Sequence, residues 1–119
     1  MENPIDEIEF LKKIKLDFNV KALKHTSLLN KPIQKVAVCG GSGSFLLSNA
    51  IKKKADIFIT SDYKYHQFFE AEGEILIADI GHYESEQYTI DLISDFLIKK
   101  FTNFAVRSTK IDTNPINYL

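Results

Sequence analysis

His82 and Glu86 are the two residues whose types and spacing best suit metal chemistry in this sequence. They lie in residues 78–86, where Gly81 permits a sharp exit from an apolar strand and places His82 at its end. Four positions separate the imidazole from the carboxylate, so both side chains share one face if a helix begins here. Zn, Mn and Fe accept such mixed nitrogen and oxygen ligands. Two ligands are not a complete site, and the alternative is a helix cap followed by a first-turn acid.

A glycine-rich loop between an apolar run and a helical pattern is the second candidate. Its glycines allow the backbone to approach a ligand, and the amide groups of the following helix can meet an anion. The spacing fits neither a P-loop nor a dinucleotide fingerprint. A tight turn with Ser42 or Ser44 as helix N-cap is the alternative. We expect contacts to a phosphate or carboxylate of a substrate from Gly40, Gly41, Ser42 and Gly43.

The third candidate loop, residues 60–66, also follows a buried apolar strand. Asp62 and His66 are four residues apart and would share a helical face, where a carboxylate can orient an imidazole or assist proton transfer. We therefore expect substrate contacts from Thr60 and Asp62 and a catalytic role for His66. The alternatives are that Asp62 is an N-cap and that His66 is packed among its aromatic neighbours.

The elements that position these loops alternate between strands and helices. Apolar spacing predicts an amphipathic helix over residues 6–18 and a longer one after Gly81. Shorter helical patterns follow residues 44 and 64. The predicted strands cover residues 22–27, 35–39, 57–59, 75–80 and 104–107. This order predicts a single α/β domain over residues 1–119, with a largely parallel or mixed central sheet and helices on both faces. Ligands of such sheets bind at the carboxyl ends of the strands, where the three candidate loops lie.

The composition restricts the class of protein. The chain has 119 residues, of which 45% are hydrophobic and 26% charged, which is typical of a globular domain with its own core. A net charge of −1 gives no strong indication of nucleic-acid binding. No apolar stretch approaches the length of a membrane span, so no membrane association is expected. Cys39 is the only cysteine, which excludes an intrachain disulfide and favours a reducing, cytoplasmic location.

Three motifs in order resemble the carboxyl-terminal part of the NIF-three-like dinuclear metal-centre family, whose bacterial members are often labelled GTP cyclohydrolase type 2 homologues. They are residues 36–44, residues 60–66 with Thr-Ser-Asp and Tyr-His, and residues 81–86 with Gly-His-Tyr-Glu-Ser-Glu. The ending at residues 113–116 is also similar. The resemblance covers residues 30–118 well, whereas residues 1–29 match only loosely as a leader.

This resemblance implies two divalent metal ions in the full-length protein, held by a His-His pair and an Asp in addition to a carboxyl-terminal His and Glu. The last two map onto His82 and Glu86. The sequence has no adjacent His pair, so we expect this chain to be the carboxyl-terminal segment of a longer protein with an incomplete site. The resemblance also implies a homo-oligomer for that protein.

Three functions remain open. The first is a metal-dependent hydrolase acting on a nucleotide-like substrate, with this segment inactive alone. The second is a metal-binding regulatory or protein-interaction module without turnover. The third is a free-standing small nucleotide-binding α/β domain without a metal, in which residues 40–44 would form the phosphate loop.

Overall fold

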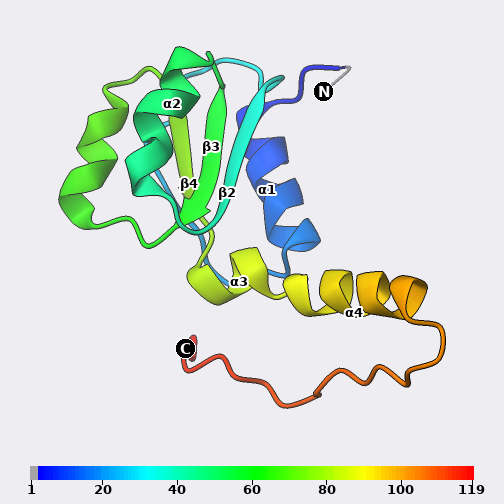
Figure 1. Cartoon of the computed structure of the whole chain (residues 1–119). Helices are drawn as coiled ribbons and strands as arrows, with labels where there is room; N and C mark the ends of the chain where they lie inside the picture. Colours follow the sequence, from blue (N-terminus) through cyan, green and yellow to red (C-terminus); the bar gives the residue numbers. More distant parts are fainter. Residues whose placement is uncertain (1–2) are drawn as a thin grey trace.

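The computed structural model describes residues 3–119 and shows a four-stranded sheet between helices, followed by a projecting helix and an extended tail (Figure 1). The helices are α1 (Glu7–Asp17), η1 (Ser44–Leu46), α2 (Leu47–Lys52), η2 (Tyr65–Ala71), α3 (His82–Glu86) and α4 (Thr89–Lys100), of which η1 and η2 are 3₁₀ helices. The strands are β1 (Lys24–His25), β2 (Val36–Ser42), β3 (Ile57–Ser61) and β4 (Leu76–Asp79). No helix within residues 3–119 has the length and apolar character required to cross a membrane.

The sheet has the order β1-β4-β3-β2. Strands β2, β3 and β4 are parallel, and β1 pairs with β4 in the antiparallel direction. The sheet is therefore mixed, which confirms the predicted fold class. Every residue of β3 and β4 is buried, as is expected of central parallel strands that are covered on both faces.

Side chains alternate between two cores, one on each face of the sheet. On one face, Ile57, Ile59 and Leu76 pack in the core that contains residues of α1. On the other face, Phe58 and Ile77 pack in the core that contains residues of α2 and η2. Helices thus cover both faces, and the carboxyl ends of the parallel strands are left to carry the loops.

Residues 3–29 are an integral part of this packing. The Asp6 side chain caps α1 by accepting hydrogen bonds from the amides of Ile8 (2.9 Å) and Glu9 (3.1 Å). The buried Glu7 carboxylate accepts hydrogen bonds from the amides of Leu29 (2.8 Å) and Asn30 (2.9 Å). Glu7 therefore joins the start of α1 to the segment that leads into β2.

Three of the predicted elements differ from the structure. The predicted strand over residues 104–107 is wrong, because this segment has no neighbouring strand to pair with in the described chain. The helix predicted after Gly81 is divided at residues 87 and 88 into α3 and α4. The predicted strand over residues 22–27 shortens to β1, after which the Thr26 hydroxyl accepts the hydrogen bond of the Ile77 amide (3.0 Å).

Candidate metal and ligand site

The candidate site lies where β2, β3 and β4 end and α3 begins. α3 packs against the ends of β2 and β3. Gly81, with φ of 93°, makes the turn from β4 into α3 that the sequence predicts. His82 and Glu86 therefore reach the sheet edge from the first and last residues of one short helix.

His82 lies between two carboxylates. Its Nδ1 is 2.6 Å from Oδ2 of Asp62, which comes from the end of β3, and its Nε2 is 3.3 Å from Oε2 of Glu86. An ionised carboxylate only accepts hydrogen bonds, so Nδ1 donates to Asp62. In the neutral ring this leaves the lone pair on Nε2, directed toward Glu86.

The arrangement of these three residues suits a metal ligand pair. A histidine that ligates a metal through one nitrogen usually donates from the other to a carboxylate, which fixes the orientation of the ring. His82 and Glu86 are about half exposed, so their donor atoms can be reached from outside. Within residues 3–119 no group of three or more His, Cys, Asp or Glu side chains could hold a metal. His82 and Glu86 could supply two ligands of a larger site, and Asp62 would then orient the His82 ring.

The two carboxylates shift the protonation of His82. The hydrogen bond to Asp62, aided by the charges of Asp62 and Glu86, raises the pKa of His82 above its ordinary value of 6.5, although partial burial acts in the opposite direction. Because the folded-state pKa is raised, the resulting stabilisation is fully present below pH 6.5 and is lost as the pH rises through the folded-state pKa. Protons therefore compete with a metal for Nε2 up to a higher pH than for an unpaired histidine.

Asp62→Asn should lower the pKa of His82, because it removes both the charge and the carboxylate acceptor. The measurement is an NMR titration of the His82 ring protons in the metal-free chain. Asp17→Asn is the control of equal charge change, since Asp17 pairs with Lys13 on α1. If the pKa of His82 is the same in the wild type and in Asp62→Asn, the hydrogen bond at 2.6 Å does not form in solution.

Asp79 is a site residue that the sequence analysis did not single out. Its buried carboxylate accepts hydrogen bonds from the amides of Tyr63 (3.1 Å) and Gly81 (3.2 Å) and pairs with Nζ of Lys24 (2.7 Å). It therefore links the loop that carries Asp62 to the turn that carries His82. The sequence did contain an indication of its role, because Asp79 is an acidic residue at the end of an otherwise apolar strand, and a buried carboxylate needs polar partners.

The glycine run lies against α3. The Gly41 amide donates to Oγ of Ser85 (2.8 Å), and that hydroxyl donates to the carbonyl oxygen of His82 (2.8 Å). A Cβ at Gly41 would lie 2.5 Å from Oε1 of Glu86. The absence of side chains here lets α3 approach β2, and the Gly41 amide is already used within the protein.

The other predicted ligand residues take different positions. Gly40 and Ser42 are exposed, whereas Gly43 packs against Thr60, whose buried hydroxyl donates to the Gly41 carbonyl oxygen (3.1 Å). Neither Ser42 nor Ser44 caps the following helix, because Gly43 occupies the N-cap position. These positions leave Gly40 and Ser42 as the members of the run that solvent reaches most freely.

Asp62 and His66 do not form the predicted pair. Asp62 lies before η2, whose N-cap is Lys64, and the Asp62 carboxylate bonds to His82. His66 lies exposed on η2. The shared helical face was wrong because the helix begins three residues after Asp62.

Two cavities of about 400 and 300 Å³ flank His82. Ile116 lines both of them, so the carboxyl-terminal tail forms part of the walls. The tail is held by the Tyr118 hydroxyl, which donates to Oε1 of the buried Glu84 (3.0 Å). Lys24 lines the smaller cavity and provides a positive charge close to His82.

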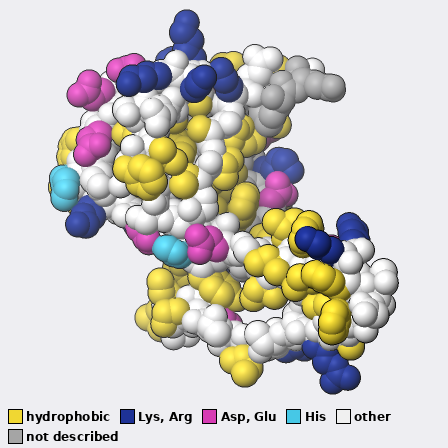
Figure 2. All heavy atoms as spheres, in the orientation of Figure 1, with side chains coloured by type: hydrophobic (Ala, Val, Ile, Leu, Met, Phe, Trp, Pro, Cys, Tyr) yellow, Lys and Arg dark blue, Asp and Glu magenta, His cyan; other side chains and the backbone are white. Residues whose placement is uncertain are grey.

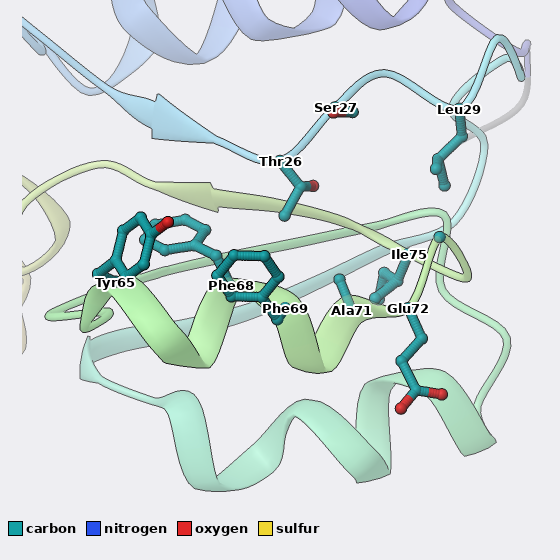
Figure 3. Close-up of a pocket in the computed structure, with 10 residues that line it drawn as sticks. Thr26, Ser27, Leu29, Tyr65, Phe68, Phe69, Ala71, Glu72 and Ile75 are labelled. Atoms are coloured by element: carbon teal, nitrogen blue, oxygen red, sulfur yellow. The ribbon is translucent and has the colours of Figure 1, made fainter.

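A separate groove of about 450 Å³ lies away from His82, between η2 and the segment after β1 (Figure 3). Tyr65, Phe68 and Phe69 line it, together with Thr26 and Ile75. Among the described residues that line this groove there is no histidine or cysteine, and most of the lining side chains are apolar, with Glu72 as the one charged member.

Comparison with known proteins places these features in a family context. A model of the family described as Duf34/NIF3 (NGG1p interacting factor 3) matches residues 1–115. A Campylobacter jejuni protein named GTP cyclohydrolase 1 type 2 homolog is 36% identical over 107 residues, which are 88% of this chain and 42% of that protein. A Staphylococcus epidermidis protein of the same name is 31% identical over 114 residues, which are 92% of this chain and 31% of that protein.

The solved structures give the same relation. Staphylococcus aureus protein SA1388 has a TM-score of 0.84 with this chain at 26% identity, over 100% of this chain and 40% of SA1388. The chain thus spans less than half of the length of each of these relatives.

Proposed function

Because this chain belongs to the Duf34/NIF3 family, we propose that it supplies part of a dinuclear metal centre in a metal-dependent hydrolase acting on a nucleotide-like substrate. His82 and Glu86 are the ligands from this chain, and Zn, Mn and Fe suit their mixed donors. Two ions and the remaining ligands belong to the full-length protein. The name of the relatives, GTP cyclohydrolase 1 type 2 homolog, suggests a guanine nucleotide or a related compound.

The observation that carries this proposal is that both ring nitrogens of His82 face a carboxylate, Nδ1 that of Asp62 and Nε2 that of Glu86. A structural histidine needs only one partner, whereas here one nitrogen is held by a carboxylate and the other faces a second carboxylate. When bound, paired divalent ions would lower the pKa of a water molecule and polarise the substrate. The residues of this chain would orient the imidazole, provide the Glu86 oxygens and keep the ligand atoms accessible.

The cavities beside His82 are the proposed location of the substrate. Lys24 can attract an anionic group there, although its pairing with Asp79 already uses part of its charge. Gly40 and Ser42 are exposed at the adjacent end of β2 and suit a polar contact with a substrate. Proton transfer by His66 remains a prediction. His66 is exposed on η2, and the Asp62 carboxylate that was expected to assist it bonds to His82 instead.

Metal titration of the 119-residue chain tests the ligand assignment. We expect Zn²⁺ to bind with a dissociation constant of roughly 10 μM or weaker, because two ligands supply only part of the roughly 10–16 kcal/mol of a complete zinc site. His82→Ala and Glu86→Gln should abolish the binding measured by calorimetry. His66→Ala is the matched control and should bind as the wild type does. Tight binding of two metal ions per chain, or equal binding by His82→Ala, would contradict the assignment.

A metal-binding regulatory or interaction module is the second candidate, favoured by the exposed apolar side chains of α4. The two candidates differ in turnover. In the Campylobacter jejuni relative, changing the residues aligned with His82 and Glu86 should abolish hydrolysis within a nucleotide library if the first candidate holds. The module would be favoured by two results together. The variants would lose metal binding, and the unmodified relative would hydrolyse no compound of the library.

A further inference from the structure

The carboxyl-terminal tail, residues 102–119, reaches the candidate site without forming a helix or a strand of its own. Figure 1 shows that the tail runs back beneath α4 and ends below α3. Figure 2 shows a hollow between α4 and much of the tail. The position of the tail is therefore determined by a small number of side-chain contacts, and those near its end lie beside His82.

The segment that reaches His82 has a conformation set by its own side chains. The Asp112 carboxylate accepts a hydrogen bond from the Asn114 amide (2.9 Å), and Oδ1 of Asn114 accepts one from the Ile116 amide (3.1 Å). Turns of this kind limit the freedom of the backbone, and Pro115 fixes a further dihedral angle. The segment is therefore partly ordered before it docks, which lowers the entropic cost of docking.

A hydrogen bond to a buried carboxylate anchors the end of the tail. The Tyr118 hydroxyl donates to Oε1 of Glu84 (3.0 Å), and Glu84 is only 5% exposed. Burial, together with the hydrogen bond to Glu84 and its charge, raises the pKa of Tyr118 above its ordinary value, so the hydroxyl keeps its proton at neutral pH. Nζ of Lys21 lies 5.9 Å from the centre of the Tyr118 ring and adds a cation–π contact. Tyr118 is thus held through both its hydroxyl and its ring.

Glu84 connects this anchor to the proposed metal ligands. It lies on α3 midway between His82 and Glu86. Its side chain folds back under the turn at Gly81, where a Cβ would collide with Oε2 of Glu84. Within residues 3–119, this Oε2 has no hydrogen-bond partner. Loss of the Tyr118 hydroxyl would remove the described donor to the other oxygen of a buried carboxylate, which is costly, so the tail and α3 stabilise each other.

Helix α3 depends on such contacts because it has only five residues. A helix this short is unstable in isolation, since its nucleation is unfavourable and few hydrogen bonds follow. The Ser85 amide closes its first turn by donating to the Gly81 carbonyl oxygen (3.1 Å). Contacts from outside α3 therefore decide how firmly His82 and Glu86 are held on one face.

We propose that the tail is a strap that positions α3 through the contact between Tyr118 and Glu84, so that docking of the tail and metal binding by His82 and Glu86 strengthen each other. Tyr118 is a positioning residue, since it acts through Glu84. The proposal rests on the metal ligands proposed above and adds a means of regulating them. Because Ile116 lines both cavities beside His82, release of the strap would also open that space to a larger ligand.

Amide hydrogen exchange in the metal-free 119-residue chain tests the positioning role. Tyr118→Phe removes the hydroxyl and keeps the ring. We expect the Ser85 amide of α3 to exchange about tenfold faster in this variant, because a hydrogen bond to a charged group is lost. Tyr88→Phe is the matched control, since the Tyr88 hydroxyl donates to the Asp17 carbonyl oxygen at the same distance of 3.0 Å but not to α3. This control should leave the exchange of the Ser85 amide unchanged.

Two substitutions of Glu84 show whether the hydrogen bond itself transmits the effect. In Glu84→Gln the side-chain oxygen can still accept from the Tyr118 hydroxyl, so the exchange of the Ser85 amide should stay close to that of the wild type. In Glu84→Ala the acceptor is gone, so the exchange should be fast, and adding Tyr118→Phe should change nothing further.

Calorimetric titration with Zn²⁺ tests the coupling to the metal. Tyr118→Phe should raise the dissociation constant about fivefold or more, whereas Tyr88→Phe should leave it unchanged. Coupling between two binding events is reciprocal. Saturating Zn²⁺ should therefore raise the NMR order parameters of the amides of residues 116–118 in the wild type but not in Tyr118→Phe.

The two measurements separate failure of the strap from failure of the ligand assignment. Equal exchange of the Ser85 amide in the wild type and in Tyr118→Phe would overturn the positioning role, and equal Zn²⁺ affinity of the two would overturn the coupling. A wild type that binds no Zn²⁺ would overturn the ligand assignment and with it the coupling. The exchange rates of the metal-free variants would still decide whether the tail positions α3.

Discussion

Asp79→Ala is expected to lower the free energy of unfolding by about 3 kcal/mol, as measured by urea denaturation. The side chain is 3% exposed and accepts hydrogen bonds from two backbone amides. Removing it leaves the amide of the buried Tyr63 without its acceptor, and each such buried group costs about 1–3 kcal/mol. The pairing with Lys24 adds little, because the Lys24 side chain is largely exposed.

Asp56→Ala is the matched control for this prediction. The Asp56 carboxylate also accepts hydrogen bonds from two backbone amides, those of Gln34 (2.9 Å) and Lys35 (2.7 Å), but it does so at the surface. Water can replace a surface acceptor, so the loss of stability should be clearly smaller. Asp79→Ala should also broaden the NMR signals of His82, since both loops of the site lose their common link. Equal effects of the two substitutions would mean that burial of Asp79 is not what makes it important.

Gly41→Ala should both destabilise the chain and displace Glu86. The backbone of Gly41 has φ of 65°, a conformation that costs a residue with a Cβ about 1–2 kcal/mol. The new Cβ would also lie 2.5 Å from Oε1 of Glu86 and 3.3 Å from Cε1 of His82. We expect a total loss of about 3 kcal/mol in urea denaturation and a loss of Zn²⁺ binding in calorimetry, because Glu86 must move.

Gly73→Ala separates the two causes. Gly73 has φ of 73°, close to that of Gly41, but a Cβ there would meet no atom within 4 Å. This control should show only the backbone cost and should bind Zn²⁺ as the wild type does. If the two substitutions destabilise the chain equally and both retain metal binding, the glycine at position 41 is needed for its backbone conformation alone.

Much of the fold could be predicted because local patterns and tertiary packing agree. The continuous apolar run around Phe58 is typical of a central parallel strand, and it is one. The segment at Phe104 has a similar apolar pattern, yet it forms no strand because a strand needs a neighbour for its backbone hydrogen bonds. The local pattern therefore correctly indicates that this segment could form a strand. Whether it does so depends on a neighbouring strand, which the local pattern does not reveal.

The same limit applies to the site. The four-residue spacing of His82 and Glu86 is local, so sequence alone could place them on one helix face. The contact between Asp62 and His82 joins residues twenty positions apart, and it depends on the adjacency of β3 and β4 in the sheet. Asp62 was assigned to His66 instead, because only the local partner is visible before the strand order is known.

The contacts of Glu7 limit how this domain could be transferred to another protein by gene fusion during evolution. Its carboxylate holds the amides of Leu29 and Asn30, and the helix that it begins covers one face of the sheet. A gene fusion whose junction fell after residue 17 would preserve every candidate site residue but would leave that face bare and those two amides without their acceptor. The smallest transferable module therefore begins upstream of α1, and α1 is the element that such a recombination could least omit.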